Sequence, residues 1–453
     1  MRNPLLRLTA RAPRAFAALL APLLVLSGCR KPAPEEHVYT GAAPPSSPGT
    51  GAGGSGAVPG AGGTPSAGAG SVPEGGTGAT SGGQGGAPAT MQFTKGALLE
   101  AAVDCAMERY SKFEERAVTL RDDLAALDES PTDAALDRAR RSFVSAMESW
   151  QEAELFRFGP AARSAEPGGQ NLRDEIYGWP LVSTCRVDEQ IVNEAYAATD
   201  FATASFVNGR TLSALDYLLF YEGRESTCTA LSPIVQSGAF AALSEDELRK
   251  RRAAYALRVA EGVLARVREL SRAWDPKGGN FRGEMLAAGS GSGTFASEHV
   301  ALNAVSNALF YLDKEVKDWK LARPAGLGEC FSGNCAELVE ARYARTSVTY
   351  IVRNLAGFRR LFQGCGSGGQ GVGFDDWLAA VGAEELRDAM LEALDEAEAS
   401  IAEIASLEAA LASEPDRVAA AHAKVKAITD LLKADFITML DLELPIATAS
   451  DND

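Results

Sequence analysis

Apolar residues recur every three or four positions through most of the chain from Thr94 onward, and alternating apolar and polar runs are scarce. This spacing matches the turn of an α-helix, about 3.6 residues, rather than the two-residue repeat of a strand. The pattern therefore predicts an all-α body. Long helices are expected at about 95–127, 132–157, 296–320 and 337–363.

Three further apolar stripes have the length of bundle helices. The first follows Ser244-Glu245-Asp246-Glu247, which has the pattern of an N-terminal capping box, and it continues to Trp274. The second covers 386–411 and the third 418–439, with Glu414-Pro415 between them. The opposite faces of these stripes are charged, as in the outer surface of a helix bundle.

The amount of apolar sequence in the body is enough for two cores rather than one. The Gly-rich segment 275–280 is the simplest place to divide them, and the segment 289–295 is the alternative hinge. We therefore expect two packed helical bundles within a body at 91–453. The first bundle is expected at about 91–275 and the second at about 281–453.

Residues 1–28 are organised like a secretory signal peptide. Basic residues come first, and an apolar run follows that is shorter than the roughly 20 residues a membrane span needs. The run ends in Leu-Ser-Gly-Cys, which resembles a bacterial lipobox, with Cys29 as the lipidated residue. Arg30 after it resembles the sorting pattern of outer-membrane lipoproteins. We therefore expect an outer-membrane lipoprotein of the cell envelope that is anchored to the membrane through Cys29.

Residues 29–90 are expected to form a disordered tether between this anchor and the body. Of the 50 residues at 41–90, 46 are Gly, Ala, Pro, Ser or Thr, which leaves almost nothing to build a core. The whole chain has a formal net charge of −16, and the leader's removal makes the mature chain more acidic still. Such acidity argues against nucleic acid as a partner.

Besides Cys29 the chain has six cysteines, an even number that favours disulfides in an exported protein. Sequence alone leaves their pairing open, although Cys330 and Cys335 flank a short segment and are the best candidates for a local bridge. A cysteine metal site is not favoured, because paired CxxC spacing is absent and the three histidines are scattered. The other disulfide candidates are Cys105, Cys185, Cys228 and Cys365.

Two segments carry the side chains with chemical potential. Glu154 and Arg157 lie three residues apart at a predicted helix end, as either a surface ion pair or a buried pair. In "TLSALDYLLF", Ser213 and Asp216 also lie three apart, so their side chains are neighbours on one helix face. A serine hydroxyl is a weak ligand for zinc or iron compared with imidazole, so Asp216 would carry any metal affinity.

Five segments, taken in order, resemble the imelysin family of cell-envelope proteins, which includes metallopeptidase-like and iron-regulated members. The resemblance covers about 94–453 and implies two helical bundles with a site at their junction. The segments are "SWQEAELFRFGPA", "GWPLV", "TLSALDYLLF", "ELVEARYARTSVTYIVRNLAGFRRLFQG" and "AITDLLKADFITMLDLELPIATASDND".

The family's signature is Gly-x-His-x-x-Glu, and aligning it on "ALDYLLF" places Thr211, Ser213 and Asp216 at its three defined positions. All three differ from the signature, so the expected imidazole ligand is missing here. Ser347 falls where the family keeps a serine, and His299 is the nearest histidine that could approach the junction. We therefore predict a pocket that joins these positions to Glu154 and Arg157.

Three functions stay open at this point. The first is a non-catalytic binding protein that holds a metal, an iron species or another ligand at the junction, with iron-uptake components as partners. The second is a metallopeptidase with substituted ligands, and the third is a structural envelope protein that has lost the site. No HExxH run occurs in the chain, and the cofactor is unknown, with a divalent metal or iron as the candidates.

Overall fold

The computed structural model describes residues 93–448 apart from 329, 331–334, 367–369 and 446–447. The expected signal peptide, the lipobox cysteine Cys29 and the tether lie outside these residues. The part of the chain that is described is built of helices without a strand, which confirms the all-α expectation. None of its helices combines the length and the apolar character that crossing a membrane requires.

The first bundle is built on α1 (Lys95–Glu129) and α8 (Glu245–Trp274), with α2 (Asp133–Ala153) and α6 (Leu212–Phe220) packed beside them. The Ser244 hydroxyl accepts a hydrogen bond from the Glu247 backbone N–H at 3.1 Å and so caps α8. The predicted apolar stripe of α8 is buried through to Trp274. Shorter helices complete this bundle: α3 (Leu172–Ile176), α4 (Thr184–Asn193), α5 (Phe201–Ala204) and α7 (Pro233–Gln236).

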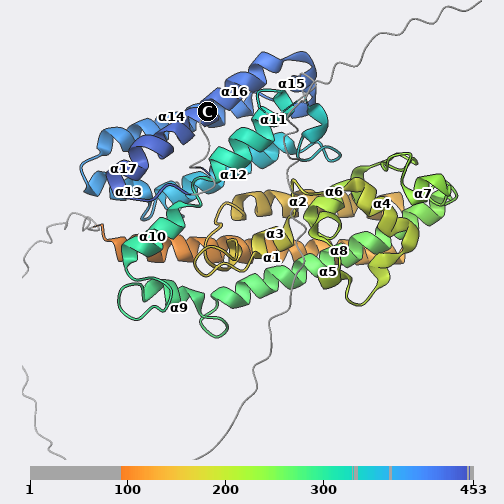
Figure 1. Cartoon of the computed structure of the whole chain (residues 1–453), viewed down its shortest axis with the longest axis horizontal. Helices are drawn as coiled ribbons and strands as arrows, with labels where there is room; N and C mark the ends of the chain where they lie inside the picture. Colours follow the sequence, from red (N-terminus) through yellow and green to blue (C-terminus); the bar gives the residue numbers. More distant parts are fainter. Residues whose placement is uncertain (1–92, 329, 331–334, 367–369, 446–447, 449–453) are drawn as a thin grey trace, which may run out of the picture. The chain divides into compact units, whose positions relative to one another are not determined.

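The second bundle packs α14 (Glu384–Ala402) between α12 (Ser347–Gln363) and α16 (Pro415–Leu431). The π-helix η4 (Leu312–Ala322) packs on both α12 and α16, and Figure 1 shows this group beside the first bundle. The shorter elements of the second bundle are α11 (Arg323–Ala325), η5 (Ala336–Leu338), α13 (Phe374–Ala380), α15 (Leu407–Ser413), η6 (Leu432–Phe436) and α17 (Ile437–Leu440).

Helices α9 (Phe281–Leu286) and α10 (Glu298–Ser306) connect the two bundles and pack on α1. The described residues all belong to one compact unit, so the division at 275–280 stays a prediction. The bundles meet where α12 lies on α2, and Gly357 allows the close approach. A Cβ at that position would lie 2.7 Å from the Glu152 carbonyl oxygen. A disulfide between Cys105 on α1 and Cys365 after α12 also joins the bundles.

Three predicted helices differ from the structure, and two of the differences fall at this junction. The third is the stripe expected at 386–411, which residues 403–406 divide into α14 and α15. The expected helix at 296–320 is α10 followed by turns and then the π-helix η4. The expected helix at 337–363 begins only at Ser347, and the residues before it form η5 and turns. The backbone N–H groups of Tyr343 and Ala344 donate to Asp216 instead of to carbonyls of their own segment. Tertiary hydrogen bonds therefore replace helical ones there.

Candidate functional site

Two of the three positions on which the family signature was aligned, Ser213 and Asp216, lie in helix α6, and the third, Thr211, is its N-cap residue. The helix is buried along most of its length, so its polar side chains must find partners inside the protein. Thr211 Oγ1 accepts a hydrogen bond from the Gly178 N–H at 3.0 Å and donates to the Val207 carbonyl at 3.1 Å. Ser213 Oγ lies 3.0 Å from Thr211 Oγ1. Both hydroxyls are therefore committed to local hydrogen bonds.

Asp216 joins α6 to the segment that precedes α12. Its Oδ1 accepts the Ala344 N–H at 2.8 Å, and its Oδ2 accepts the Tyr343 N–H at 3.2 Å. Burial raises the pKa of Asp216 from 3.8 to about 7, against the two N–H groups that lower it; the nearby carboxylates of Glu340 and Glu408 raise it further. The carboxyl group therefore changes charge near neutral pH while it is held by backbone from outside its own helix.

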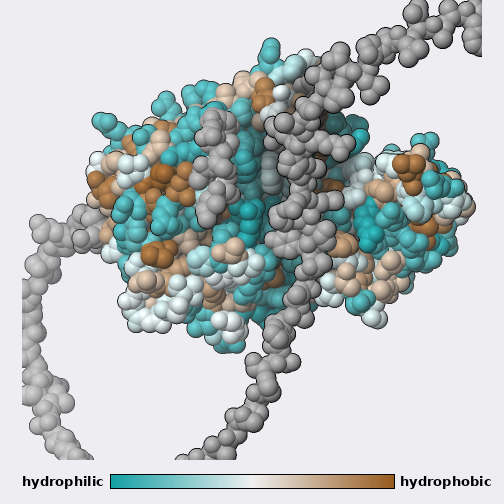
Figure 2. Space-filling view, in the orientation of Figure 1, coloured by the Kyte–Doolittle hydropathy of each residue, from teal (hydrophilic) through white to brown (hydrophobic). Residues whose placement is uncertain are grey.

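A cavity of about 240 Å³ lies beside Asp216 at the junction of the bundles. Its wall combines aromatic, acidic and basic side chains from α6, the end of η4 and the segment before α12. Figure 2 shows a mainly hydrophilic surface along the line between the bundles where grey atoms do not cover it. We call this the junction cavity, and its polar and aromatic lining includes Trp179, Ser213, Asp216, Tyr217, Trp319, Arg323, Glu337, Glu340, Arg342 and Tyr343.

A buried ionic network centred on Lys320 lies next to the junction cavity. The Lys320 ammonium donates to Gln151 Oε1 at 2.6 Å and to Asn354 Oδ1 at 2.7 Å. It also lies 3.0 Å from Glu340 Oε1 and 3.4 Å from Glu154 Oε1. These five side chains come from α2, η4, α12 and the loop before α12, and we call them the Lys320 network. Because charges this deeply buried need partners, the network fixes both bundles in one arrangement.

Glu154 extends this network toward the first bundle. Its Oε2 accepts a hydrogen bond from Arg173 at 2.9 Å, and its Oε1 accepts one from the Tyr311 hydroxyl at 2.5 Å. Arg157 pairs instead with Glu315 at 2.6 Å. Glu154 and Arg157, which the sequence places three residues apart at a helix end, therefore bind different partners. The Glu154 side chain is fully buried.

Two buried polar atoms of residues that line the junction cavity have no hydrogen-bond partner among the described residues. Glu340 Oε1 accepts from Tyr177 at 2.8 Å and Gln151 at 3.1 Å in addition to Lys320, whereas Glu340 Oε2 accepts nothing. Arg323 Nε is likewise buried and unpaired. An unpaired buried polar group costs about 1–3 kcal/mol, so both atoms require an explanation.

The structure brings only some of the predicted pocket residues to the cavity. Ser213 and Asp216 line it, whereas Thr211 lies behind Ser213. Ser347 supports the cavity wall from outside, since its Oγ accepts the Ala341 N–H at 3.2 Å. Glu154 reaches the wall only through Lys320, and Arg157 takes no part in it.

His299 lies at a different place from the cavity. Its Nδ1 is 2.9 Å from Lys95 Nζ, its Nε2 is 2.7 Å from the Asp441 carbonyl oxygen, and its ring packs against Trp377. His299, which the sequence offered as a pocket candidate, therefore does not line the junction cavity. Both ring nitrogens already have partners in this second location.

The residues at the junction cavity do not fit a catalytic zinc or iron centre. Such a centre takes three protein ligands, commonly with imidazole nitrogen among them. Here both Asp216 oxygens accept backbone N–H groups, and the Ser213 hydroxyl is paired with Thr211. The cavity lining described above contains no histidine.

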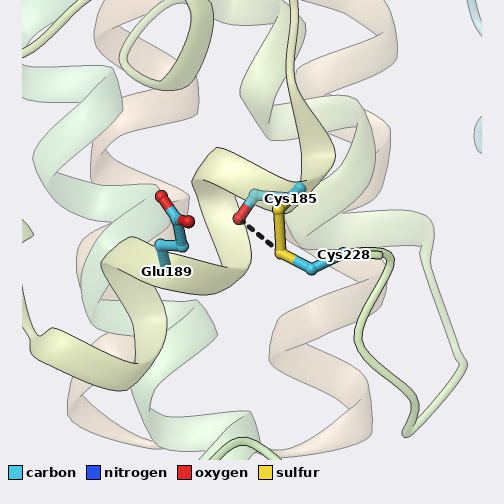
Figure 3. A group of neighbouring side chains, drawn as sticks. All are labelled: Cys185, Glu189 and Cys228. Carbon is cyan, nitrogen blue, oxygen red and sulfur yellow. Dashed lines mark hydrogen bonds between the residues drawn. A yellow bond between two sulfur atoms is a disulfide. The ribbon is translucent and has the colours of Figure 1, made fainter. Parts of the chain in front are cut away.

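One group of potential ligand atoms elsewhere in the described residues is close enough to hold a metal. Cys185, Glu189 and Cys228 have ligand atoms within 4.8 Å of one another. Figure 3 shows, however, that the two cysteines form a disulfide, which leaves no thiolate to bind a metal. Glu189 is 3.2 Å from Arg186. Cys330 and Cys335 form the third disulfide, and none of the three pairs offers a free thiol.

Sequence reasoning missed most of the cavity wall. Trp319 and Lys320 fell at the end of a predicted regular helix, and Glu340 fell inside another, where nothing distinguished them from surface residues. Trp179 appears only within "GWPLV", one of the segments of the family resemblance. The available signal was in "ELVEARYARTSV", a segment of the family resemblance, in which Glu340 is one of several charged residues.

Comparisons with known proteins agree with this architecture. No curated protein matches the chain in sequence. The crystal structure of an imelysin-like protein from Psychrobacter arcticum 273-4 superposes with a TM-score of 0.56 at 17% identity, covering 78% of this chain and 96% of that one. A protein from Parabacteroides distasonis ATCC 8503, assigned as an iron-regulated protein A precursor, superposes with a TM-score of 0.58 at 14% identity, covering 78% and 97%. At such identities the two structures support the fold alone.

The family comparison is more specific than the structural ones. The family model described as Imelysin matches residues 106–434, which is well over half of the chain. The match includes α6, the Lys320 network and every residue that lines the junction cavity. The chain therefore belongs to the imelysin family.

Proposed function

We propose that this chain is a non-catalytic imelysin-like binding protein of the bacterial envelope, and that its ligand occupies the junction cavity. The observation that carries the proposal is the contrast among the polar atoms there. Asp216 and Ser213 are bonded to the protein itself, whereas Glu340 Oε2 and Arg323 Nε are buried without partners. A concave site that keeps buried polar atoms unpaired is typical of a binding pocket.

Hydrolysis of a peptide bond with a metal would require three things of this cavity: a held cation, a water whose pKa the cation lowers, and a base beside that water. Asp216 is the one residue of the aligned signature that could serve, and both of its oxygens accept hydrogen bonds from the backbone. The binding hypothesis therefore fits the donor set better than the metallopeptidase alternative does.

The envelope location of this function is part of the proposal. A lipid on Cys29 and the Gly-rich tether would hold the binding domain near the outer membrane while leaving it free to meet its ligand. The imelysin family and the neighbour assigned as an iron-regulated protein make components of iron uptake the first partners to test. We expect Cys29→Ser to move the protein from the membrane fraction to the soluble envelope fraction.

The proposal can be tested by native mass spectrometry of the protein purified gently from its own cells. We expect the wild type to carry a bound non-protein mass that is released on unfolding. Trp319→Ala removes part of the cavity wall and should lower the bound fraction. Phe206→Ala, at an exposed residue outside the cavity, is the matched control and should retain the ligand. A wild type without any bound mass would favour the structural alternative.

A hydrolysis assay separates the binding protein from the metallopeptidase. We expect no cleavage of an unfolded protein substrate above the level of a mock purification, with or without added divalent metal. Cleavage that is abolished by chelator and by Asp216→Ala, but not by the Phe206→Ala control, would establish the metallopeptidase instead. Metal analysis of the same samples would show whether an iron species is the cargo.

A further inference from the structure

We propose that the junction cavity binds a small zwitterion of the α-amino-acid class, with the ligand's carboxylate on Arg323 and its ammonium on Glu340. This inference rests on the proposed function and names the ligand of the same site. It follows from which buried atoms lack partners, from the charges around them and from the size of the cavity.

The anion-binding end of the cavity is formed by arginine. Arg323 is the first residue of α11, and its Nε is buried without a hydrogen-bond partner. Across the described ranges, no carboxylate pairs with Arg323 or with Arg342. The Arg342 guanidinium carbon lies 5.7 Å from the centroid of the Tyr343 ring. A guanidinium presents parallel N–H groups that match the two oxygens of a carboxylate. The carboxylate of a ligand would therefore satisfy a donor that the protein leaves open.

The cation-binding end is formed by Glu340. Three protein groups donate to its Oε1, and its Oε2 remains a buried acceptor without a donor. The neighbouring acceptor, Asp216, is already held by two backbone N–H groups. A ligand ammonium beside Glu340 Oε2 would supply the missing donor. It would also offset the negative charge of the Glu340 and Asp216 carboxylates.

The rest of the wall is suited to an uncharged side chain. Trp179 and Trp319 meet edge to face, with ring centroids 6.1 Å apart, and Leu338 and Val339 lie in the same lining. Aromatic and aliphatic surface of this kind binds apolar groups and excludes water from the charged contacts.

Size and charge exclude other classes of ligand. At about 240 Å³ the cavity is smaller than the roughly 300–1,000 Å³ of pockets that hold drug-sized molecules. The lining residues with carboxyl groups are Asp216, Glu337 and Glu340, and those with guanidinium groups are Arg323 and Arg342. A free divalent cation would face two guanidinium groups, and a dianion would face three carboxyl groups. A small molecule that carries one charge of each sign meets neither conflict.

Equilibrium dialysis tests the proposal directly. The mature protein is dialysed against an equimolar mixture of free L-amino acids, and the composition of each chamber is measured by mass spectrometry. We expect one amino acid, or a group with similar apolar side chains, to be enriched with the protein. The N-acetyl derivative of that amino acid lacks the ammonium, and its amide lacks the carboxylate. Each should bind about tenfold more weakly or worse.

A substitution at the proposed carboxylate partner identifies the orientation. In Arg323→Met the free amino acid and its amide should bind with similar affinity, because the partner of the carboxylate is gone. The N-acetyl derivative should still bind more weakly than the free amino acid. Arg272→Met, at an exposed arginine on α8 outside the cavity, should behave like the wild type. Circular dichroism and thermal melting would show that both variants are folded. Retention of the full acid-to-amide ratio in Arg323→Met would overturn the assignment.

The failure of this inference can be told apart from failure of the proposed function. If no amino acid is enriched, the zwitterion assignment is overturned. The proposed function nevertheless stands if protein from its own cells carries another mass that Trp319→Ala removes. If neither amino acids nor any co-purified mass is bound, both are overturned.

Discussion

The Lys320 network and the junction cavity lie side by side and share Glu340, yet they differ in whether their buried polar atoms have hydrogen-bond partners. In the network, the Lys320 ammonium lies within 3.4 Å of acceptors on four side chains, Glu340 Oε1 among them. In the cavity, Glu340 Oε2 and Arg323 Nε have no partner among the described residues. We interpret the difference in terms of the proposed function: the network holds the bundles together, and the two unpaired atoms of the cavity are left for a ligand to bind.

The largest effect should come from breaking the network. Lys320→Met leaves the buried carboxylates of Glu154 and Glu340 without their shared cation. We expect the free energy of unfolding to fall by about 3–5 kcal/mol, measured by urea denaturation. Lys424→Met, which removes an exposed pair with Glu396, is the control and should cost about 1 kcal/mol or less. Equal losses in the two variants would contradict a structural role for the network.

A pH-dependent effect of intermediate size is expected from Asp216. Its pKa is about 7 in the folded protein, against 3.8 ordinarily. Between these two pH values the folded state therefore binds one proton that the unfolded state has already lost. Wild-type stability should therefore fall, relative to Asp216→Asn, as the pH rises from about 4 to about 7. The change should be on the order of 2 kcal/mol, because a pKa unit corresponds to about 1.4 kcal/mol and the site relaxes around the charge. Parallel curves of unfolding free energy against pH for the two proteins would refute the raised pKa of the buried Asp216 carboxyl group.

A smaller effect, of opposite sign, is expected at Arg323. Removing a guanidinium that is buried in part and unpaired should leave the stability of the ligand-free protein unchanged or raise it by up to about 1 kcal/mol. Arg272→Met should change stability by less than about 0.5 kcal/mol. Thermal melting of ligand-free protein measures both. A clear loss of stability in Arg323→Met would mean that the guanidinium has a structural partner, so that the cavity and the Lys320 network would no longer differ in this respect.

The smallest effect should follow metal removal. The Asp216 oxygens accept backbone N–H groups, and Cys185 and Cys228 are oxidised to a disulfide, so we expect chelator to leave the melting temperature unchanged. A metal that binds only the folded state would stabilise it in proportion to its occupancy. A lower melting temperature after chelation, restored by one particular metal, would show that the folded protein binds a metal and would contradict this expectation.

The sequence predicts the bundles well because helix packing obeys a simple period. The stripe from Leu248 to Trp274 is buried as expected, and the break at Pro415 is observed as the start of α16. The exceptions are informative. Residues 337–346 have the composition of a helix, but Asp216 takes the N–H groups of Tyr343 and Ala344, which an extended helix would need for itself.

The cavity could not be predicted in the same way, because its residues are brought together by tertiary contacts. Ser213 and Asp216 were found through the aligned signature, whereas Trp179, Arg323 and Glu340 come from three separate segments. Arg323 follows a π-helix that local sequence patterns do not distinguish from an α-helix. Sequence therefore indicates the helix that contributes to the site, and only the packing of the bundles reveals its partners.

We propose that the junction cavity binds an organic ligand rather than a catalytic metal. The most direct test is a crystal structure of the protein purified from its own cells, with anomalous diffraction recorded at the iron and zinc absorption edges. We expect non-protein density that bridges Arg323 and Glu340 and carries no anomalous signal. An anomalous peak within bonding distance of the Asp216 carboxylate, or a cavity that contains only water, would contradict it.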